Sequence, residues 1–178
     1  MNIQCKSCGV LDVVVEGIVY PWHRQRLPWW LNPSLFNGQA AQILHSAGQA
    51  CFQELPSSLA LTAAVHTSAG ELSYRYRGIV HVAGSSLLGS CTASQVCKST
   101  ENALRVAQEA GLSSIAFPVV DHEFGSLSQE EALGLVLRTL RGASAAGRFD
   151  VERVVLCTMG FSIAETTENL NPFASLAC

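Results

Sequence analysis

Short apolar segments rich in β-branched residues alternate with longer segments of helical periodicity, and this alternation constrains the fold more than any other feature. Branched side chains fit a pleated strand, whereas apolar residues three and four apart line one helix face. The expected strands are 10–20, 59–66, 78–83, 114–118 and 151–157, and the expected helices are 39–54, 92–110 and about 128–143. Strands alternating with helices predict an α/β domain, whose ligands bind at the carboxyl ends of parallel strands.

Three positions mark where regular elements end or begin. Gly111 is placed to cap the carboxyl end of helix 92–110, because glycine accepts the left-handed conformation. The run from Ser128 to Glu131 resembles a capping box that opens the next helix. Pro21 and two later prolines interrupt residues 21–34, so we expect an irregular surface excursion there.

Composition excludes several classes of protein. The chain has 178 residues, 48% of them apolar and 14% charged, with a net charge of −3. A disordered chain needs more charge and fewer apolar residues, and a general nucleic-acid binder needs an excess of Lys and Arg. No apolar stretch approaches the roughly 18 residues of a membrane span. We therefore expect one domain over 1–178 that binds neither DNA nor membranes.

The first nine residues and the cysteines bear on the cellular compartment. Residues 1–9 contain no apolar segment of the kind found in signal peptides, so we expect a cytoplasmic protein. The chain has seven cysteines, and an odd number in a well-cored chain favours reduced thiols.

Two polar loops that precede helices are the best candidates for chemistry. The loop 121–126 contains Asp121, His122 and Glu123 and leads into a helix N-terminus, where backbone N–H groups suit an anion. The loop 32–39 contains Asn and Gly residues that tolerate left-handed geometry and can form an anion-binding nest. The alternative for both loops is an ordinary connection followed by a helix cap.

Metal and cofactor sites are not predicted. The pair Cys5 and Cys8 has the spacing of half a zinc site, but no second pair follows at a suitable distance. The five histidines lack metal-ligand spacing, and we expect His45 and His81 to be core residues because they lie inside apolar segments. No phosphate-binding glycine motif of the common nucleotide-binding classes is present. We therefore expect no metal and no cofactor.

Three tryptophans lie between the early prolines. Trp22, Trp29 and Trp30 could stack on a base, plug a hydrophobic gap or form a surface for a protein partner.

Several segments share a pattern with one known family, in the family's order. They are Asn32-Pro33-Ser34-Leu35 with Gly38, Ile43 to Gly48, Tyr76 to Gly84, Gly111 to Pro118, Phe124-Gly125, Glu130-Glu131-Ala132 and Val151 to Leu156. On these residues the chain resembles the macro domain, an ADP-ribose-binding module. The run Ser-Ile-Ala-Phe-Pro at 114–118 is the most specific match.

The resemblance implies a fold and a domain layout. The implied fold is a three-layer α/β/α sandwich around a mixed, mostly parallel sheet of about six strands. The likeness covers about 9–160, with an irregular insertion at 20–31 and a loose carboxyl-terminal tail at 161–178.

The chain departs from the family pattern at three places. The acidic residue that the family places directly after a glycine, near the first strand, is replaced here by Val10, and Asp12 comes two positions later. The family's glycine string is reduced to Asn37-Gly38-Gln39. Ala41 stands where hydrolytic members often carry Asp.

The resemblance implies that the chain binds ADP-ribose or an ADP-ribosylated protein between the two loops. Asn32 would contact the distal ribose, and the backbone of Gly38 and Gln39 would approach the diphosphate. Phe161 would stack on adenine. The implied ligand-binding residues are Asn32, Asn37, Gly38, Gln39, Phe124, Gly125, Ser126 and Phe161.

Two other functions stay open at this point. The first is hydrolysis of ADP-ribose adducts or deacylation of O-acyl-ADP-ribose, with Asn32 orienting water and His122, Asp121 or Glu123 acting as base. The second is a degenerate macro domain that binds another nucleotide or a protein.

Overall fold

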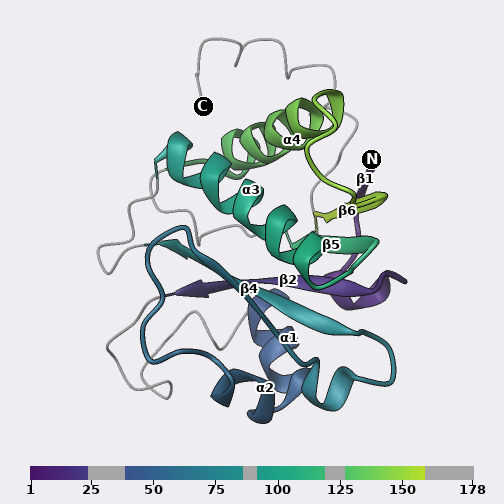
Figure 1. Cartoon of the computed structure of the whole chain (residues 1–178), viewed down its shortest axis with the longest axis vertical. Coiled ribbons are helices and arrows are strands. Elements are labelled where there is room, and N and C mark those ends of the chain that lie inside the picture. The colour runs from purple at the N-terminus through teal and green to yellow at the C-terminus, as the bar shows by residue number, and fades with distance from the viewer. Residues whose placement is uncertain (24–38, 86–91, 119–126, 159–178) are drawn as a thin grey trace.

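A six-stranded mixed sheet forms the middle layer of the computed structural model, which describes residues 1–23, 39–85, 92–118 and 127–158. Helices cover both faces, with α1 and α2 below the sheet and α3 and α4 above it in the view of Figure 1. The strands are β1 (Asn2–Lys6), β2 (Gly17–His23), β3 (Ala64–Thr67), β4 (Gly78–Ser85), β5 (Ser114–Pro118) and β6 (Arg153–Cys157). The helices are α1 (Gln39–Ala47), α2 (Ala50–Gln53), α3 (Ala93–Glu109) and α4 (Gln129–Ala145), with short 3-10 turns η1 (Val10–Asp12) and η4 (Gly70–Leu72). The expected three-layer α/β/α architecture is confirmed.

The strand order in the sheet is β1-β6-β5-β2-β4-β3. All neighbouring pairs are parallel except β3 with β4, which is antiparallel. The carboxyl ends of the five parallel strands therefore lie along one edge of the sheet. We call this edge the carboxyl edge.

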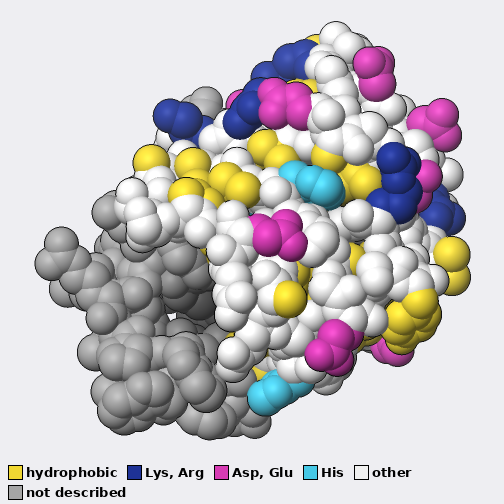
Figure 2. Space-filling model, turned by 60° about the horizontal axis from the view of Figure 1, so that its bottom comes forward, with side chains coloured by type: hydrophobic (Ala, Val, Ile, Leu, Met, Phe, Trp, Pro, Cys, Tyr) yellow, Lys and Arg dark blue, Asp and Glu magenta, His cyan; other side chains and the backbone are white. Residues whose placement is uncertain are grey.

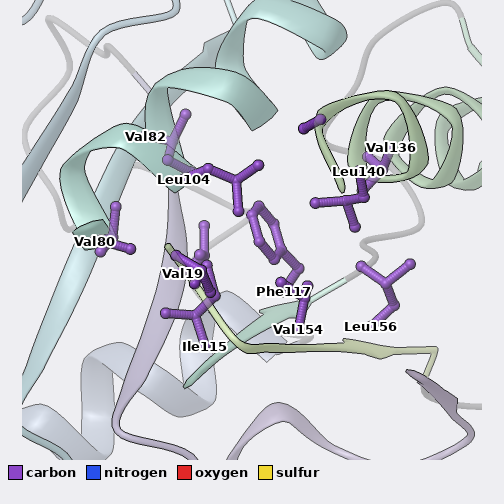
Figure 3. Close-up of a cluster of buried hydrophobic side chains, with 14 of the residues drawn as sticks. Val19, Val80, Val82, Leu104, Ile115, Phe117, Val136, Leu140, Val154 and Leu156 are labelled. Atoms are coloured by element: carbon purple, nitrogen blue, oxygen red, sulfur yellow. The ribbon is translucent and has the colours of Figure 1, made fainter. Parts of the chain in front are cut away.

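The face of the sheet under α3 and α4 carries the larger hydrophobic cluster. Leu104 from α3 and Leu140 from α4 are fully buried against Ile115 and Val154 of the sheet. Figure 3 shows these side chains converging with Phe117 from the end of β5. Each such burial contributes about 1.5–3 kcal/mol, so this cluster holds both long helices to the sheet.

The opposite face packs against α1 and the short turns. Ile43 and Ala47 of α1 are fully buried against Ile18 and Ile79 of the two central strands. Tyr76 closes this layer, since its hydroxyl donates to the carbonyl oxygens of Leu11 and Val13 at 3.1 and 3.3 Å. The connection between β1 and β2 is therefore fixed to the sheet.

The two long helices begin and end as the sequence predicts. Ser128 Oγ accepts from the backbone N–H of Glu131, while the Glu131 carboxylate accepts from the Ser128 N–H, which is the expected capping box. Thr92 and Gln95 form a second capping box at the start of α3. Gly111 follows α3 with a φ of +65°, which confirms its expected role at the helix end.

Replacing Ser128 by Ala is expected to lower the free energy of unfolding by about 1 kcal/mol, because the N–H of Glu131 loses its acceptor. Urea unfolding followed by circular dichroism measures this loss. Ser128→Asp is the control, because aspartate is an equally good cap and should retain most of the stability. Equal stability of the Ala and Asp variants would contradict the prediction.

Three sequence-predicted elements are wrong in part. The expected helix 39–54 is interrupted at Gly48, whose φ of +71° ends α1 and separates it from α2. The expected strand 59–66 begins only at Ala64, because Thr62 has a φ of 69° that no strand can contain. Part of the expected strand 10–20 is the turn η1, since Asp12 caps the N–H of Gly9.

The prolines do not exclude residues 21–23 from the sheet. Pro21 pairs with Val82 inside β2, although we expected the irregular excursion to begin there. Among the described residues, the ladder from β2 to β5 covers Gly17 and Ile18 and does not reach Pro21. A strand tolerates a proline where no ladder bond needs its N–H.

The cysteines only partly fit the expectation of reduced thiols. Cys5, Cys8, Cys51 and Cys157 are free, but Cys97 is disulfide-bonded. None of the helices in the described part of the chain is long and apolar enough to cross a membrane.

Candidate functional site

The carboxyl edge is where both predicted ligand loops attach to the sheet. β2 leads toward residues 24–38, which end at the first residue of α1. β5 leads toward residues 119–126, which end just before Ser128, the cap of α4. Because β2 and β5 are neighbours in the sheet, the two loops leave it from adjacent positions. This is the arrangement that the sequence predicts for a common site.

Most of the predicted site residues lie outside the described residues. This applies to Asn32, Asn37, Gly38, Asp121, His122, Phe124, Gly125, Ser126 and Phe161, as well as Trp29 and Trp30. Their roles stay predictions. The backbone of Trp22 belongs to β2, whereas Gln39 is described in full.

Gln39 begins α1, and its side chain is turned into the protein with 2% of the residue exposed. Its Oε1 accepts from the backbone N–H of Val10 at 2.8 Å. Its Nε2 donates to the carbonyl oxygen of Cys157 at 3.0 Å. One amide therefore connects the start of α1 to the turn η1 and to the last residue of β6. The sequence predicts a ligand role for the backbone of Gln39 but gives no sign of this inward side chain.

The turn η1 differs from the family pattern in a way that the structure explains. Val10 is fully buried in the cluster below the sheet, so its side chain belongs to the core. Asp12 is exposed, and its Oδ2 accepts from the N–H of Gly9 at 3.0 Å. The Asp12 carboxylate is therefore already bound to the backbone of this turn.

Three helices direct their N-termini toward the carboxyl edge, where partial positive charge favours an anion. In α3 and α4, part of this charge is used by the capping boxes of Thr92 and Ser128. α4 also carries Glu130 and Glu131 in its first turn, whereas α1 has no acidic residue there. The starts of α1 and α3 thus have no first-turn carboxylate that opposes an anion, and α1 is the one of these two that directly follows a predicted ligand loop.

The end of β6 holds a buried thiol beside a second one. Burial and the adjacent Cys8 thiol raise the pKa of Cys157 to about 12. Cys157 therefore stays neutral at physiological pH and cannot act as a nucleophile or a metal ligand without deprotonation. Groups of three or more potential metal ligands are absent from the described residues.

An apolar pocket lies beside the carboxyl edge, on the face that α3 and α4 cover. Its cavity volume is about 40 Å³. Val19 and Pro21 of β2 and Phe117 of β5 form its floor, and the hydroxyls of Ser99 and Thr100 are its polar groups. Thr100 donates to the Val96 carbonyl, and the Ser99 hydroxyl has no partner among the described residues. A space this small and apolar does not suit a diphosphate.

His81 is the most deeply buried ionisable side chain near the centre of the sheet. It is fully buried, as expected, and Tyr20 and Phe52 lie against its ring. Its Nε2 lies 2.8 Å from Thr67 Oγ1, and its Nδ1 has no partner within the described part of the chain. Burial lowers its pKa to about 3, so His81 is neutral and structural. The matching expectation for His45 is wrong, because His45 is exposed on α1.

The surface shows no continuous basic patch on the face drawn in Figure 2, where Lys and Arg side chains lie among Asp and Glu side chains. Among the described residues, Arg77 pairs with Glu16, Arg105 with Glu109, and Arg148 with Glu101. This distribution does not resemble the surface of a general nucleic-acid binder.

Comparison with known proteins identifies a family and a fold. The model of the macro domain family matches residues 33–136, which include the first predicted ligand loop except Asn32, the second loop and the start of α4. A comparison with curated proteins finds no match.

Solved structures of macro domains resemble this fold over almost its whole length. The Trypanosoma brucei macrodomain has a TM-score of 0.75 at 18% identity, covering 94% of this chain and 65% of that chain. The macro domain of ganglioside induced differentiation associated protein 2 has a TM-score of 0.74 at 21% identity, covering 96% and 83%. A mutant of the Oceanobacillus iheyensis macrodomain with ADPR has a TM-score of 0.66 at 23% identity, covering 96% and 91%. This chain thus spans slightly less than two thirds of the Trypanosoma brucei structure.

Proposed function

Because this chain belongs to the macro domain family, we propose that it binds ADP-ribose, or the ADP-ribose group of a modified protein, at the carboxyl edge. The observation that carries the proposal is the start of α1. It lies at this edge directly after the predicted ligand loop and has no acidic residue in its first turn. Its first residue, Gln39, is held by two side-chain hydrogen bonds.

The electrostatics of α1 support a diphosphate ligand. A helix N-terminus attracts anions through its unpaired N–H groups and its dipole, and a carboxylate nearby would compete for the same groups. Gln39, Ala40 and Ala41 at the start of α1 are uncharged and buried. A diphosphate placed at this end meets no negative side chain from the first turn of the helix.

The related structures support the same ligand class. The Oceanobacillus iheyensis mutant was solved with ADPR, and a Trypanosoma brucei macrodomain was solved in complex with ADP. Both share the strand and helix arrangement of this chain. Asn32, which would contact the distal ribose, precedes α1 by seven positions on the predicted ligand loop.

Isothermal titration with ADP-ribose is expected to give a dissociation constant in the micromolar range, which corresponds to a binding free energy of about −8 kcal/mol. Asn32→Ala is expected to weaken binding at least about tenfold, because a polar contact with the distal ribose is lost. Asn2→Ala is a matched control, since Asn2 is exposed at the amino end of β1, far from the carboxyl edge.

Two results would count against this function. If ADP-ribose gives neither heat nor a rise in melting temperature, the proposed ligand is wrong and the degenerate macro domain is favoured. If Asn32→Ala and Asn2→Ala bind equally well, the ligand does not occupy the predicted loop.

Hydrolysis is not part of the proposal. His122 and Asp121, its candidate bases, lie outside the described residues. Ala41, which replaces the acidic residue of many hydrolytic members, is a buried methyl group and accepts no proton. A protein partner at Trp22, Trp29 and Trp30, and a cytoplasmic location, likewise stay predictions.

A further inference from the structure

We propose that the Gln39 side chain is a positioning residue for the ligand site, holding the start of α1, the turn η1 and the end of β6 in one arrangement on which ADP-ribose affinity depends. This inference rests on the proposed function. It concerns a residue that stands where the family pattern has glycine.

The geometry of the Gln39 amide joins three segments that are distant in the sequence. Its oxygen accepts from Val10 N–H at 2.8 Å, and its nitrogen donates to the Cys157 oxygen at 3.0 Å. Val10 and Cys157 are fully buried, and Gln39 is 2% exposed. Water therefore cannot replace either bond if the amide is removed, and an unpaired buried N–H or carbonyl is costly.

Each of the three segments is next to a part of the predicted site. Gln39 directly follows Gly38, the end of the first ligand loop. Cys157 ends β6, four residues before Phe161, the predicted adenine-stacking residue. The amide thus fixes the start of α1 relative to the end of β6, the two described segments that adjoin these predicted residues in the sequence.

The inward direction of this side chain also accounts for the lost glycine. Glycine lets a backbone approach phosphate closely because it has no side chain in the way. At position 39 the side chain points into the protein, where it is bonded at both polar atoms. The side-chain amide is therefore held away from the proposed ligand side of the α1 start, and it makes a connection that glycine cannot make.

Only a side chain that both accepts and donates a hydrogen bond can bind the Val10 N–H and the Cys157 carbonyl at the same time. This requirement can be tested by substitution. A Gln39→Glu side chain has the same shape, but its ionised form accepts from Val10 and cannot donate to Cys157. Its protonated form can do both. Burial favours the protonated form of such a carboxyl, so the two states should exchange within an accessible pH range.

The experiment measures ADP-ribose affinity by titration at about pH 7.5 and about pH 5, each variant relative to wild type at the same pH. Gln39→Glu is expected to bind at least about tenfold more weakly at the higher pH and within about threefold of wild type at the lower pH. Gln39→Met, which fills the space without polar atoms, is expected to bind about tenfold more weakly at both.

Gln108→Glu is the matched control. The Gln108 side chain accepts from the Asp150 N–H at 3.0 Å at the amino end of the sheet, away from the site. Its affinity should match wild type at both pH values. Circular dichroism gives the folded fraction of each variant, so that affinity is calculated for folded protein only.

The outcomes separate this inference from the proposed function. If wild type does not bind ADP-ribose, the proposed function itself fails. If wild type binds and the Gln39→Glu ratio is the same at both pH values, or if Gln39→Met retains wild-type affinity, the positioning role is overturned. A variant that loses stability but keeps its affinity per folded molecule also overturns it, because Gln39 would then be structural only.

Discussion

Gly70→Ala is expected to lower the free energy of unfolding by at least about 3 kcal/mol, a large loss for a single residue. A Cβ added to Gly70 would lie 2.1 Å from the carbonyl oxygen of Ala47 and 3.3 Å from Cys51 Sγ. Gly70 also has a φ of +55°, which costs other residues about 1–2 kcal/mol. The backbone oxygen cannot move without shifting the end of α1, so the strain and the clash add together.

Gly147→Ala separates these two causes. Gly147 has a similar φ of +59°, but a Cβ there would have no atom within 4 Å. Gly147→Ala should therefore lower the free energy of unfolding only by the cost of the backbone strain, about 1–2 kcal/mol. Urea unfolding of both variants gives the comparison. Similar losses of stability in the two variants would show that the Ala47 carbonyl oxygen does not clash with a Cβ at position 70.

The wild-type protein is expected to lose about 2–3 kcal/mol of stability through His81 alone as the pH falls from 6.5 to about 4.5. Thr67 Oγ1 donates to the Ser68 carbonyl at 3.0 Å, so His81 Nε2 carries the proton that it shares with Thr67. A second proton would sit on Nδ1, which has no acceptor among the described residues. Burial therefore opposes the charged form.

The sign follows from which state binds the proton. The pKa of His81 is about 3 in the folded protein and 6.5 in the unfolded chain. Between these values the unfolded state binds a proton that the folded state does not, so stability falls as the pH falls. Well above pH 6.5, His81 is neutral in both states and costs the folded protein no stability. Glu54 acts against this shift through its charge, and His66 adds to it.

His81→Phe is the variant that measures this contribution. Phenylalanine suits the contacts with Tyr20 and Phe52 and does not titrate. Urea unfolding at several pH values should show a smaller acid-induced loss than in wild type, by about 2–3 kcal/mol at pH 4.5. Gly147→Ala is the control, since it lowers stability without changing a titrating group. An acid-induced loss in His81→Phe as large as in wild type would refute the assignment.

The parts of the fold that the sequence predicts well are those where local preference and tertiary packing agree. β5 is buried on both faces and reads as a continuous apolar run, and α3 has both an apolar stripe and clear end signals. The capping box at Ser128 is a local interaction that needs no distant partner.

The parts that the sequence does not predict depend on distant partners. β1 is an edge strand in which Asn2, Gln4 and Lys6 alternate with Ile3 and Cys5. Because three of its five residues are polar, we did not predict a strand there. The alternation of period two was the available signal. The inward position of Gln39 depends on Val10 and Cys157, which no local pattern relates to it.

The site can be located from the sequence more readily than its chemistry. The sequence predicts both loops, before α1 and α4, at the carboxyl ends of parallel strands, and the structure adds that the strands before them, β2 and β5, are neighbours. The side chains on those loops lie outside the described residues, and the predicted role of Asn32 is tested by the titration of its Ala variant.

The position of β1 has a consequence for how the protein is made. β1 is the first of the described strands to be synthesised, yet its neighbour in the sheet is β6, the last of them. Pairings between such distant segments form late, because a long intervening chain must first be ordered. During synthesis β1 therefore has no partner strand until β6 has been made, so the sheet can be completed only after all of its other strands exist.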